Sequence, residues 1–227
     1  MQAIGIGTLK ESSLHNEIKQ WYRQEGDLLE IKCGGYTIDI LRGDWVIEVQ
    51  TGSFSKLRKK LSELLIDHRV RLVYPVPVRK WISRIEELGG TTVSRRFSPK
   101  QGSEYSVFDE LVFLQSLINS PNLSLEILLI EQEDIWINDA KGSWRRKRWS
   151  ILDRQLLCVI NRAVFTSIDD YRFLLPEDLG QIFSSRELSN GAGITPGLAR
   201  KMLYCFTIMG IIQAEAVKNR RKYYSLV

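Results

Sequence analysis

Hydrophobic residues in the first ninety positions follow two spacings, one typical of helices and one typical of strands. Leu14, Ile18 and Trp21 follow helical spacing behind serines suited to a helix N-cap. Two β-rich runs then surround Gly34-Gly35, which indicates a hairpin. We therefore expect a mixed α/β core. The pattern predicts a helix over 12–24, strands over 28–33, 36–41 and 45–50, a helix over 54–68, a strand over 70–76 and a helix over 78–90.

The rest of the chain is predicted to begin with a long loop over 91–104 and to become mostly helical toward its end. A short, polar and strongly basic stretch at 139–149 predicts a boundary between a domain of residues 1–140 and one of residues 141–227. The other expected elements are a helix near 105–119, a strand over 123–132, helices near 150–165 and 176–184, a helix beginning at Thr195 and a hairpin over 213–227.

Composition narrows the class of protein. The chain has 227 residues with 44% hydrophobic and 26% charged residues, which is typical of globular domains. No apolar run approaches the roughly 20 residues of a membrane span, and the N-terminus lacks a signal-peptide pattern. Cys33, Cys158 and Cys205 lie far apart and the only histidines are His15 and His68, so we expect neither a disulfide framework nor structural zinc. These features favour a cytoplasmic protein that does not bind membranes.

Charge is distributed unevenly along the chain. Residues 1–140 carry 17 Lys and Arg against 20 Asp and Glu, whereas residues 141–227 carry 15 against 7. A basic C-terminal third favours contact with a polyanion, and the alternative is a solvated basic surface.

Alternation along two predicted strands brings two carboxylates to one side of the sheet. Asp39 shares a face with Thr37 and Leu41, and Glu48 shares a face with Val46 and Gln50. If these strands pair, Asp39 and Glu48 project together and offer hard oxygen ligands to Mg²⁺ or Mn²⁺.

A third carboxylate interrupts an apolar helix face. Leu14, Glu17, Ile18 and Trp21 follow the i, i+3, i+4, i+7 spacing, so Glu17 lies within the stripe that should face the sheet. A buried carboxylate needs a partner, so we expect Glu17 either to lie at the edge of the stripe or to face a metal or a cationic group.

The helical Glu17, the hairpin Asp39 and the Glu48-x-Gln50 strand resemble the arrangement of the PD-(D/E)XK nuclease superfamily, to which restriction endonucleases and archaeal Holliday junction resolvases belong. The resemblance covers roughly residues 12–90 and includes the following helix with Lys56, Lys59 and Lys60. The chain is also similar to a group of uncharacterised bacterial proteins that share this core and a C-terminal helical domain. The implied fold is a restriction-endonuclease-like mixed sheet flanked by helices.

The resemblance implies metal-dependent hydrolysis of a phosphodiester. Asp39, Glu48 and Glu17 would be the metal ligands, and Gln50 would position the attacking water. Gln50 stands where the family usually has a lysine, whose charge would stabilise the developing phosphorane or activate the water. Some active restriction enzymes also carry Gln or Glu at this place.

The last fifty residues resemble a winged helix-turn-helix domain. Thr195 as N-cap with Pro196 at the first helical position predicts the start of the helix that would enter a major groove. Arg200 and Lys201 remain available on that helix, and Arg220, Arg221 and Lys222 lie at the tip of the hairpin that would be the wing. The alternative is a protein-interaction module.

Other basic residues are candidates for contacts with phosphates. They are Lys56, the predicted loop residues Arg95, Arg96 and Lys100, and the boundary residues Arg145, Arg146, Lys147 and Arg148 with Trp144 and Trp149 beside them. The sequence therefore predicts a Mg²⁺- or Mn²⁺-dependent deoxyribonuclease that acts on duplex DNA, with a homodimer expected if both strands are cut. The alternatives are a DNA-binding regulator or scaffold with an inactive nuclease core, and a protein-interaction subunit.

Overall fold

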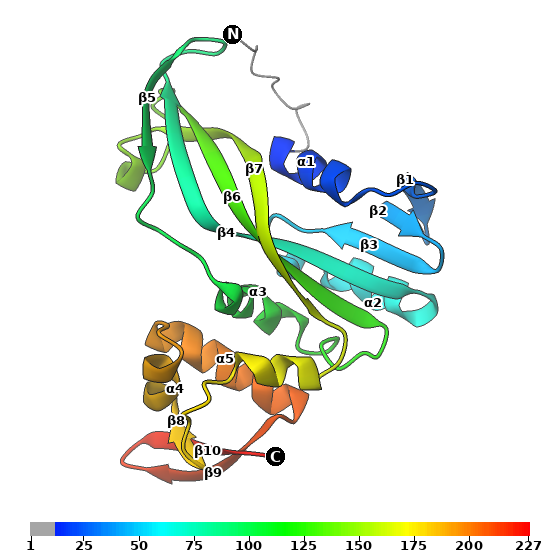
Figure 1. The fold of residues 1–227 in the computed structure, drawn as a ribbon, viewed down its shortest axis with the longest axis vertical. Coiled ribbons are helices and arrows are strands. Elements are labelled where there is room, and N and C mark those ends of the chain that lie inside the picture. The colour runs from blue at the N-terminus through cyan, green and yellow to red at the C-terminus, as the bar shows by residue number, and fades with distance from the viewer. Residues whose placement is uncertain (1–11) are drawn as a thin grey trace. The chain divides into compact units, whose positions relative to one another are not determined.

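The computed structural model describes residues 12–227 as an α/β protein with a large mixed sheet flanked by helices (Figure 1). Seven strands form this sheet in the order β1-β2-β3-β4-β6-β7, and β5 pairs with β4 outside this path. β3 and β4 are parallel, whereas the pairs β1–β2, β2–β3 and β4–β5 are antiparallel. The strands are β1 Leu28–Cys33, β2 Tyr36–Arg42, β3 Trp45–Val49, β4 Arg69–Ile85, β5 Thr92–Phe97, β6 Leu123–Ile137 and β7 Ser150–Phe165.

The first elements confirm the sequence prediction. Helix α1 (Ser13–Tyr22) buries Leu14, Ile18 and Tyr22, which recur every four residues, whereas Trp21, expected on the same apolar face, is 46% exposed. Strands β1, β2 and β3 lie where they are expected. Helix α2 (Arg58–Asp67) follows a 3₁₀ turn at Phe54–Lys56 and buries three leucines, Leu61, Leu64 and Leu65.

The helix predicted over 78–90 is wrong, because β4 continues as a strand to Ile85. Part of the loop predicted over 91–104 is strand β5, which returns antiparallel along β4 with Phe97 opposite Trp81 and Thr92 opposite Ile85. Trp81, Ile82 and Ile85 fit both a helical stripe and a strand with two buried faces, so their spacing does not distinguish the two. Pairing with β5 supplies the backbone partners that make this segment a strand.

The helix predicted near 150–165 is also wrong, because this segment is strand β7 at the end of the sheet path, beside β6. The stretch at 139–149 connects these two neighbouring strands and is not a linker between domains. The helix predicted near 105–119 consists of short turns around α3 (Phe108–Leu111), namely the 3₁₀ segments Glu104–Val107 and Val112–Leu114.

The C-terminal elements form a small helical layer on a separate three-stranded sheet. The helix predicted near 176–184 is wrong: this region ends in strand β8 (Ile182–Ser184), and helix α4 (Ser185–Gly191) begins after it. Helix α5 (Pro196–Met209) and the hairpin of β9 (Ile212–Lys218) and β10 (Arg221–Leu226) confirm the prediction. The strand order is β8-β10-β9.

Backbone contacts divide the chain into two compact units that differ from the predicted division after residue 140. The first contains the described residues up to Asp27, Pro75–Ser103 and Leu128–Arg162. The second contains Leu28–Tyr74, Glu104–Ile127 and Ala163–Val227. Among the described residues, no helix has the length and apolar character needed to cross a membrane.

Candidate active site

The strongest acidic candidate is formed by two strands of the second unit, β2 and β3. Ile40 pairs with Ile47, so the next position along this antiparallel register sets Asp39 opposite Glu48. The backbone N–H of Val49 donates to Asp39 Oδ2 at 2.8 Å, and the N–H of Asp39 donates to Glu48 Oε1 at 3.4 Å. The structure therefore brings Asp39 and Glu48 together on paired strands.

Lys60 adds a cation to this pair from helix α2. Its Nζ lies 2.6 Å from Glu48 Oε2 and donates to the carbonyl of Thr37 at 2.6 Å. The side chain of Glu48 is only 4% exposed and that of Lys60 is 15% exposed, so water screens this ion pair weakly. Lys60 is the residue that sequence reasoning missed, although it lies in the lysine-rich helix expected after the strand. Its position beside the buried Leu61 was the available signal.

The pKa of Glu48 is raised to about 7, mainly by burial and next by the neighbouring Asp39 carboxylate, whereas Lys60 acts in the opposite direction. The charged form of Glu48 is thus incompletely compensated by the groups around it. A second cation near Asp39 and Glu48 would favour the ionised pair.

Asp39 and Glu48 present carboxylate oxygens, which are the kind of ligand that Mg²⁺ and Mn²⁺ prefer. Mg²⁺ is commonly held by one or two carboxylates and completes its shell with waters and substrate phosphate oxygens. Within residues 12–227, no three His, Cys, Asp or Glu side chains cluster as a closed metal centre.

Gln50 lies in a turn after β3 that is fixed by hydrogen bonds. Its backbone N–H donates to the Val73 carbonyl at 2.8 Å, and its side-chain Nε2 donates to the Ser53 carbonyl at 3.0 Å. The next residue of the turn, Phe54, is fully buried, and its N–H donates to Glu110 Oε2 at 2.9 Å. The amide group of Gln50 is thus held in the turn.

Glu17 has a structural partner in the first unit. Its Oε2 accepts a 2.6 Å hydrogen bond from the N–H of Leu156 on β7. One turn earlier, Ser13 donates to Asp153 from its N–H at 3.1 Å and from its hydroxyl at 2.5 Å. The carboxylate of Glu17 therefore satisfies a backbone donor of β7, and its predicted role as a metal ligand stays a prediction.

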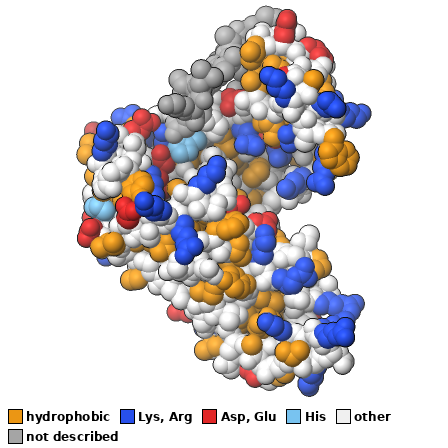
Figure 2. Space-filling view, turned by 180° about the vertical axis from the view of Figure 1, so that it is seen from behind, with side chains coloured by type: hydrophobic (Ala, Val, Ile, Leu, Met, Phe, Trp, Pro, Cys, Tyr) orange, Lys and Arg blue, Asp and Glu red, His pale blue; other side chains and the backbone are white. Residues whose placement is uncertain are grey.

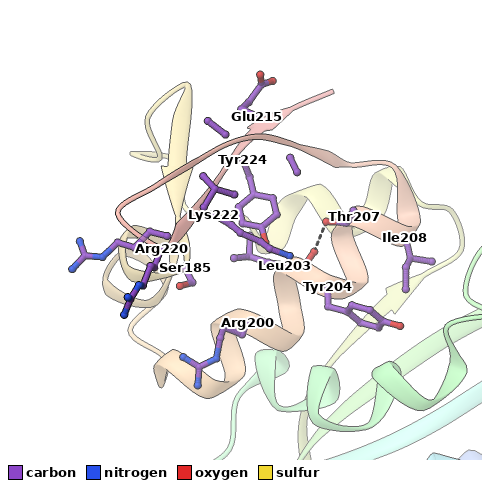
Figure 3. A pocket seen from close by; sticks show the side chains of 14 residues that line it. Ser185, Arg200, Leu203, Tyr204, Thr207, Ile208, Glu215, Arg220, Lys222 and Tyr224 are labelled. Atoms are coloured by element: carbon purple, nitrogen blue, oxygen red, sulfur yellow. Dashed lines mark hydrogen bonds between the residues drawn. The ribbon is translucent and has the colours of Figure 1, made fainter.

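A basic groove lies between α5 and the β9–β10 hairpin (Figure 3). It has a volume of about 970 Å³, and its cationic lining is Arg200, Arg220, Arg221 and Lys222. Tyr204 and Tyr224 also line it, and Glu215 is its acidic residue. Figure 2 shows blue side chains along one edge of the part that contains the small sheet.

The predicted helix and hairpin place these cations for identifiable local reasons. The Thr195 hydroxyl accepts the N–H of Leu198, and Pro196 opens α5, as the sequence predicts. Asn219 and Arg220 both have positive φ, at 52° and 63°, which is the backbone of a tight two-residue hairpin turn. Lys201, the other cation predicted on α5, donates to Asp109 at 2.8 Å.

The remaining basic candidates have different surroundings. Arg95 is engaged within its unit, because its Nε donates to Glu133 at 3.0 Å and its guanidinium lies 4.1 Å from the Trp81 ring centre. Lys56, Arg96 and Lys100 are exposed. Arg145 to Arg148 form part of the β6–β7 connection.

Two comparisons relate the chain to other proteins. A family model described as "Domain of unknown function (DUF8091)" matches residues 12–166. An uncharacterised protein of Treponema pallidum (strain Nichols) is 34% identical over 221 residues, which cover 96% of this chain and 86% of the relative. No solved structure matches.

Proposed function

We propose that this chain, which belongs to the DUF8091 family of unknown function, is a metal-dependent endonuclease that hydrolyses DNA phosphodiester bonds. The observation that carries this proposal is the buried pair of Asp39 and Glu48 with Lys60 Nζ at 2.6 Å from Glu48. Adjacent carboxylates can hold a divalent ion for phosphodiester hydrolysis, and a lysine beside them can stabilise negative charge that develops on the phosphate.

Each residue of this centre has a distinct role in the proposed reaction. Asp39 and Glu48 would hold Mg²⁺ or Mn²⁺, which supplies a Lewis acid and lowers the pKa of a bound water. Lys60 keeps positive charge beside Glu48, where negative charge develops on the phosphate oxygens during attack. Gln50, fixed through Ser53, orients the turn that follows β3.

The C-terminal elements support a winged-helix DNA-binding part. The order β8, α4, α5 and a two-stranded hairpin on one small sheet is the order of a winged helix-turn-helix. In this proposal the exposed face of α5, with Arg200, enters the major groove, and the hairpin with Arg221 and Lys222 contacts the backbone. The groove between them has the positive charge that phosphates need.

The testing experiment is cleavage of labelled duplex, single-stranded, branched and RNA substrates with Mg²⁺ or Mn²⁺. Controls contain EDTA or the Glu48→Ala variant. We expect metal-dependent cutting of DNA that disappears in Glu48→Ala. Salt-sensitive DNA binding, with no cleavage of any of these substrates by the protein in either metal, would refute the nuclease.

One observation favours a second candidate, a DNA-binding regulator or scaffold with an inactive core. Gln50 stands where nucleases of the PD-(D/E)XK superfamily usually have a lysine. Its side-chain amide donates a hydrogen bond to the Ser53 carbonyl and carries no positive charge. In that case the basic groove would still bind DNA, whereas Mn²⁺ would not raise the melting temperature. A nuclease centre predicts a Mn²⁺-dependent rise that is lost in Asp39→Asn.

A further inference from the structure

The connection between β6 and β7 is a closed, ordered loop, Gly142–Trp149, which we name the tryptophan tip. Hydrogen bonds within it join the N–H of Gly142 to the Arg148 carbonyl at 2.9 Å and the N–H of Arg148 to the Ser143 carbonyl at 3.1 Å. The N–H of Trp149 also donates to the Arg146 carbonyl at 3.0 Å. A flexible linker would leave these groups to water, so the tip holds a defined conformation.

The backbone of the tip is strained at two cationic residues. Lys147 and Arg148 adopt left-handed φ values of 52° and 66°, which are rare for residues other than glycine. Gly142 passes so close to the Trp149 carbonyl that a Cβ would lie 1.8 Å from its oxygen. Strain of this kind persists where a fixed arrangement of side chains serves a function, and here it presents Lys147 and Arg148 to solvent.

Three tryptophans around the tip have different surroundings. Trp136 is 8% exposed and Trp149 is half-buried, and the Arg84 guanidinium lies 5.8 Å and 4.9 Å from their ring centres. Trp144 is 80% exposed, with the Arg145 guanidinium 5.5 Å from its ring centre. Trp136 and Trp149 thus form the base of the tip. Trp144 exposes most of its indole to solvent, next to cationic side chains.

We propose that the tryptophan tip binds unpaired bases of a nucleic acid, with Trp144 stacking on a base and Arg145, Lys147 and Arg148 contacting the phosphates beside it. This rests on the proposed function and specifies its substrate class. An exposed indole beside several cations matches the two parts of single-stranded nucleic acid, a π-face and a charged backbone. Bases inside an intact duplex already stack on each other and offer no free face, so gaps, flaps and single strands are the preferred partners.

The test measures binding in EDTA, where catalysis plays no part. Fluorescein-labelled single strands, gapped duplexes and intact duplexes are titrated with the full-length wild-type protein, Trp144→Ala, Trp144→Phe and Phe173→Ala. Phe173 is 89% exposed and lies outside the tip, so it is the matched control. Trp144 is exposed, so its removal should leave the melting temperature unchanged.

We expect Trp144→Ala to weaken binding of single strands and gapped duplexes by roughly 5- to 150-fold, the loss of one base stack, and of intact duplexes by less than about twofold. Trp144→Phe should keep most of the affinity, and Phe173→Ala should match the wild type. Equal losses on all three nucleic acids, or no loss on any, would overturn the proposal.

A membrane surface is the competing partner of an exposed tryptophan among cations. Vesicles of phosphatidylcholine and phosphatidylserine are therefore titrated in parallel. Vesicle binding that depends on Trp144, with nucleic-acid binding unchanged, would overturn the proposal. Failure of cleavage with Trp144-dependent binding intact would refute only the nuclease, so the two proposals fail separately.

Discussion

At the scale of single residues, the acidic pair and its cation come from different kinds of element. Asp39 and Glu48 are set by strand alternation and register, which a sequence displays directly. Lys60 reaches them from α2, and the helical pattern places it only at the flank of a leucine stripe. The proximity of Asp39 and Glu48 was therefore predictable from the sequence. The position of Lys60 was not, because it depends on how α2 packs on the strands.

Lys60→Ala should abolish most cleavage. Loss of one preorganised electrostatic partner of a developing charge typically lowers kcat by about 100- to 1,000-fold. Initial rates on a labelled substrate are the measurement, with Lys59→Ala, an exposed neighbour on the same helix, as the matched control. Equal rates for Lys60→Ala and Lys59→Ala would show that the lysine only neutralises Glu48.

Glu48 should make the metal-free protein less stable as the pH rises. Its pKa is about 7 in the folded state against 4.5 in the reference state, so between these values the folded protein holds more protons than the unfolded chain. The free energy of unfolding therefore falls across this window, by about 3 kcal/mol for this group, and is constant above it. This sign is opposite to that of a carboxylate whose pKa is lowered by folding.

The measurement is the melting temperature of wild type and Glu48→Gln at pH 5 and pH 8.5 in EDTA. The difference, variant minus wild type, should be larger at pH 8.5, because the variant removes the cost of burying the charge. Glu25→Gln, at an exposed glutamate outside the carboxylate pair, is the matched control. A Glu48→Gln difference that does not change with pH contradicts the assignment.

At the scale of elements, α3 connects the turn after β3 with helix α5. Glu110 accepts a hydrogen bond from the N–H of Phe54, and Asp109 accepts one from Lys201 Nζ at 2.8 Å. Phe108 packs edge-on against Phe206 with ring centres 5.3 Å apart. One short helix thus anchors the DNA-reading helix of the proposal and holds one of its cations.

Asp109→Ala should strengthen binding to duplex DNA. Freed from its carboxylate partner, Lys201 gains a phosphate contact, which steepens the dependence of log K on log salt by about 0.9. Fluorescence anisotropy over a salt series measures this slope. Asp169→Ala removes another exposed carboxylate, whose partner Arg172 does not line the groove, and should leave the slope unchanged. A steeper slope in both variants would show that the position of the freed cation does not matter.

The strength of sequence prediction also varied by element. The N-terminal hairpin and α5 were predictable, because glycine turns and the Thr195-Pro196 start are local signals. The second half of β4 and the whole of β7 were mistaken for helices, since partners distant in the sequence decide their state. Helix α4 was missed, although Ser184 and Glu187 form a capping box that the sequence displays.

At the scale of the whole molecule, the excess of positive charge and the acidic centre lie in different parts of the chain. Residues 141–227 carry 15 Lys and Arg against 7 Asp and Glu, and this part includes the α5–hairpin groove. The family match stops at residue 166, before α5, whereas the Treponema pallidum relative aligns over 96% of the chain. The combination of both parts is therefore shared beyond this one protein.

This division predicts separable kinetic effects. Arg200 and Arg221 line the groove and do not belong to the carboxylate centre, so Arg200→Ala with Arg221→Ala should raise KM for duplex cleavage and leave kcat nearly unchanged. Each lost phosphate contact should also reduce the salt slope of binding by about 0.9.

Glu48→Gln should have the opposite effect, lowering kcat without weakening binding in EDTA, because its side chain is buried beside Lys60. Steady-state kinetics and anisotropy on one labelled duplex measure both. A fall in kcat for the arginine variants with KM unchanged would mean that the groove acts in the chemical step, and the separation of roles would be wrong.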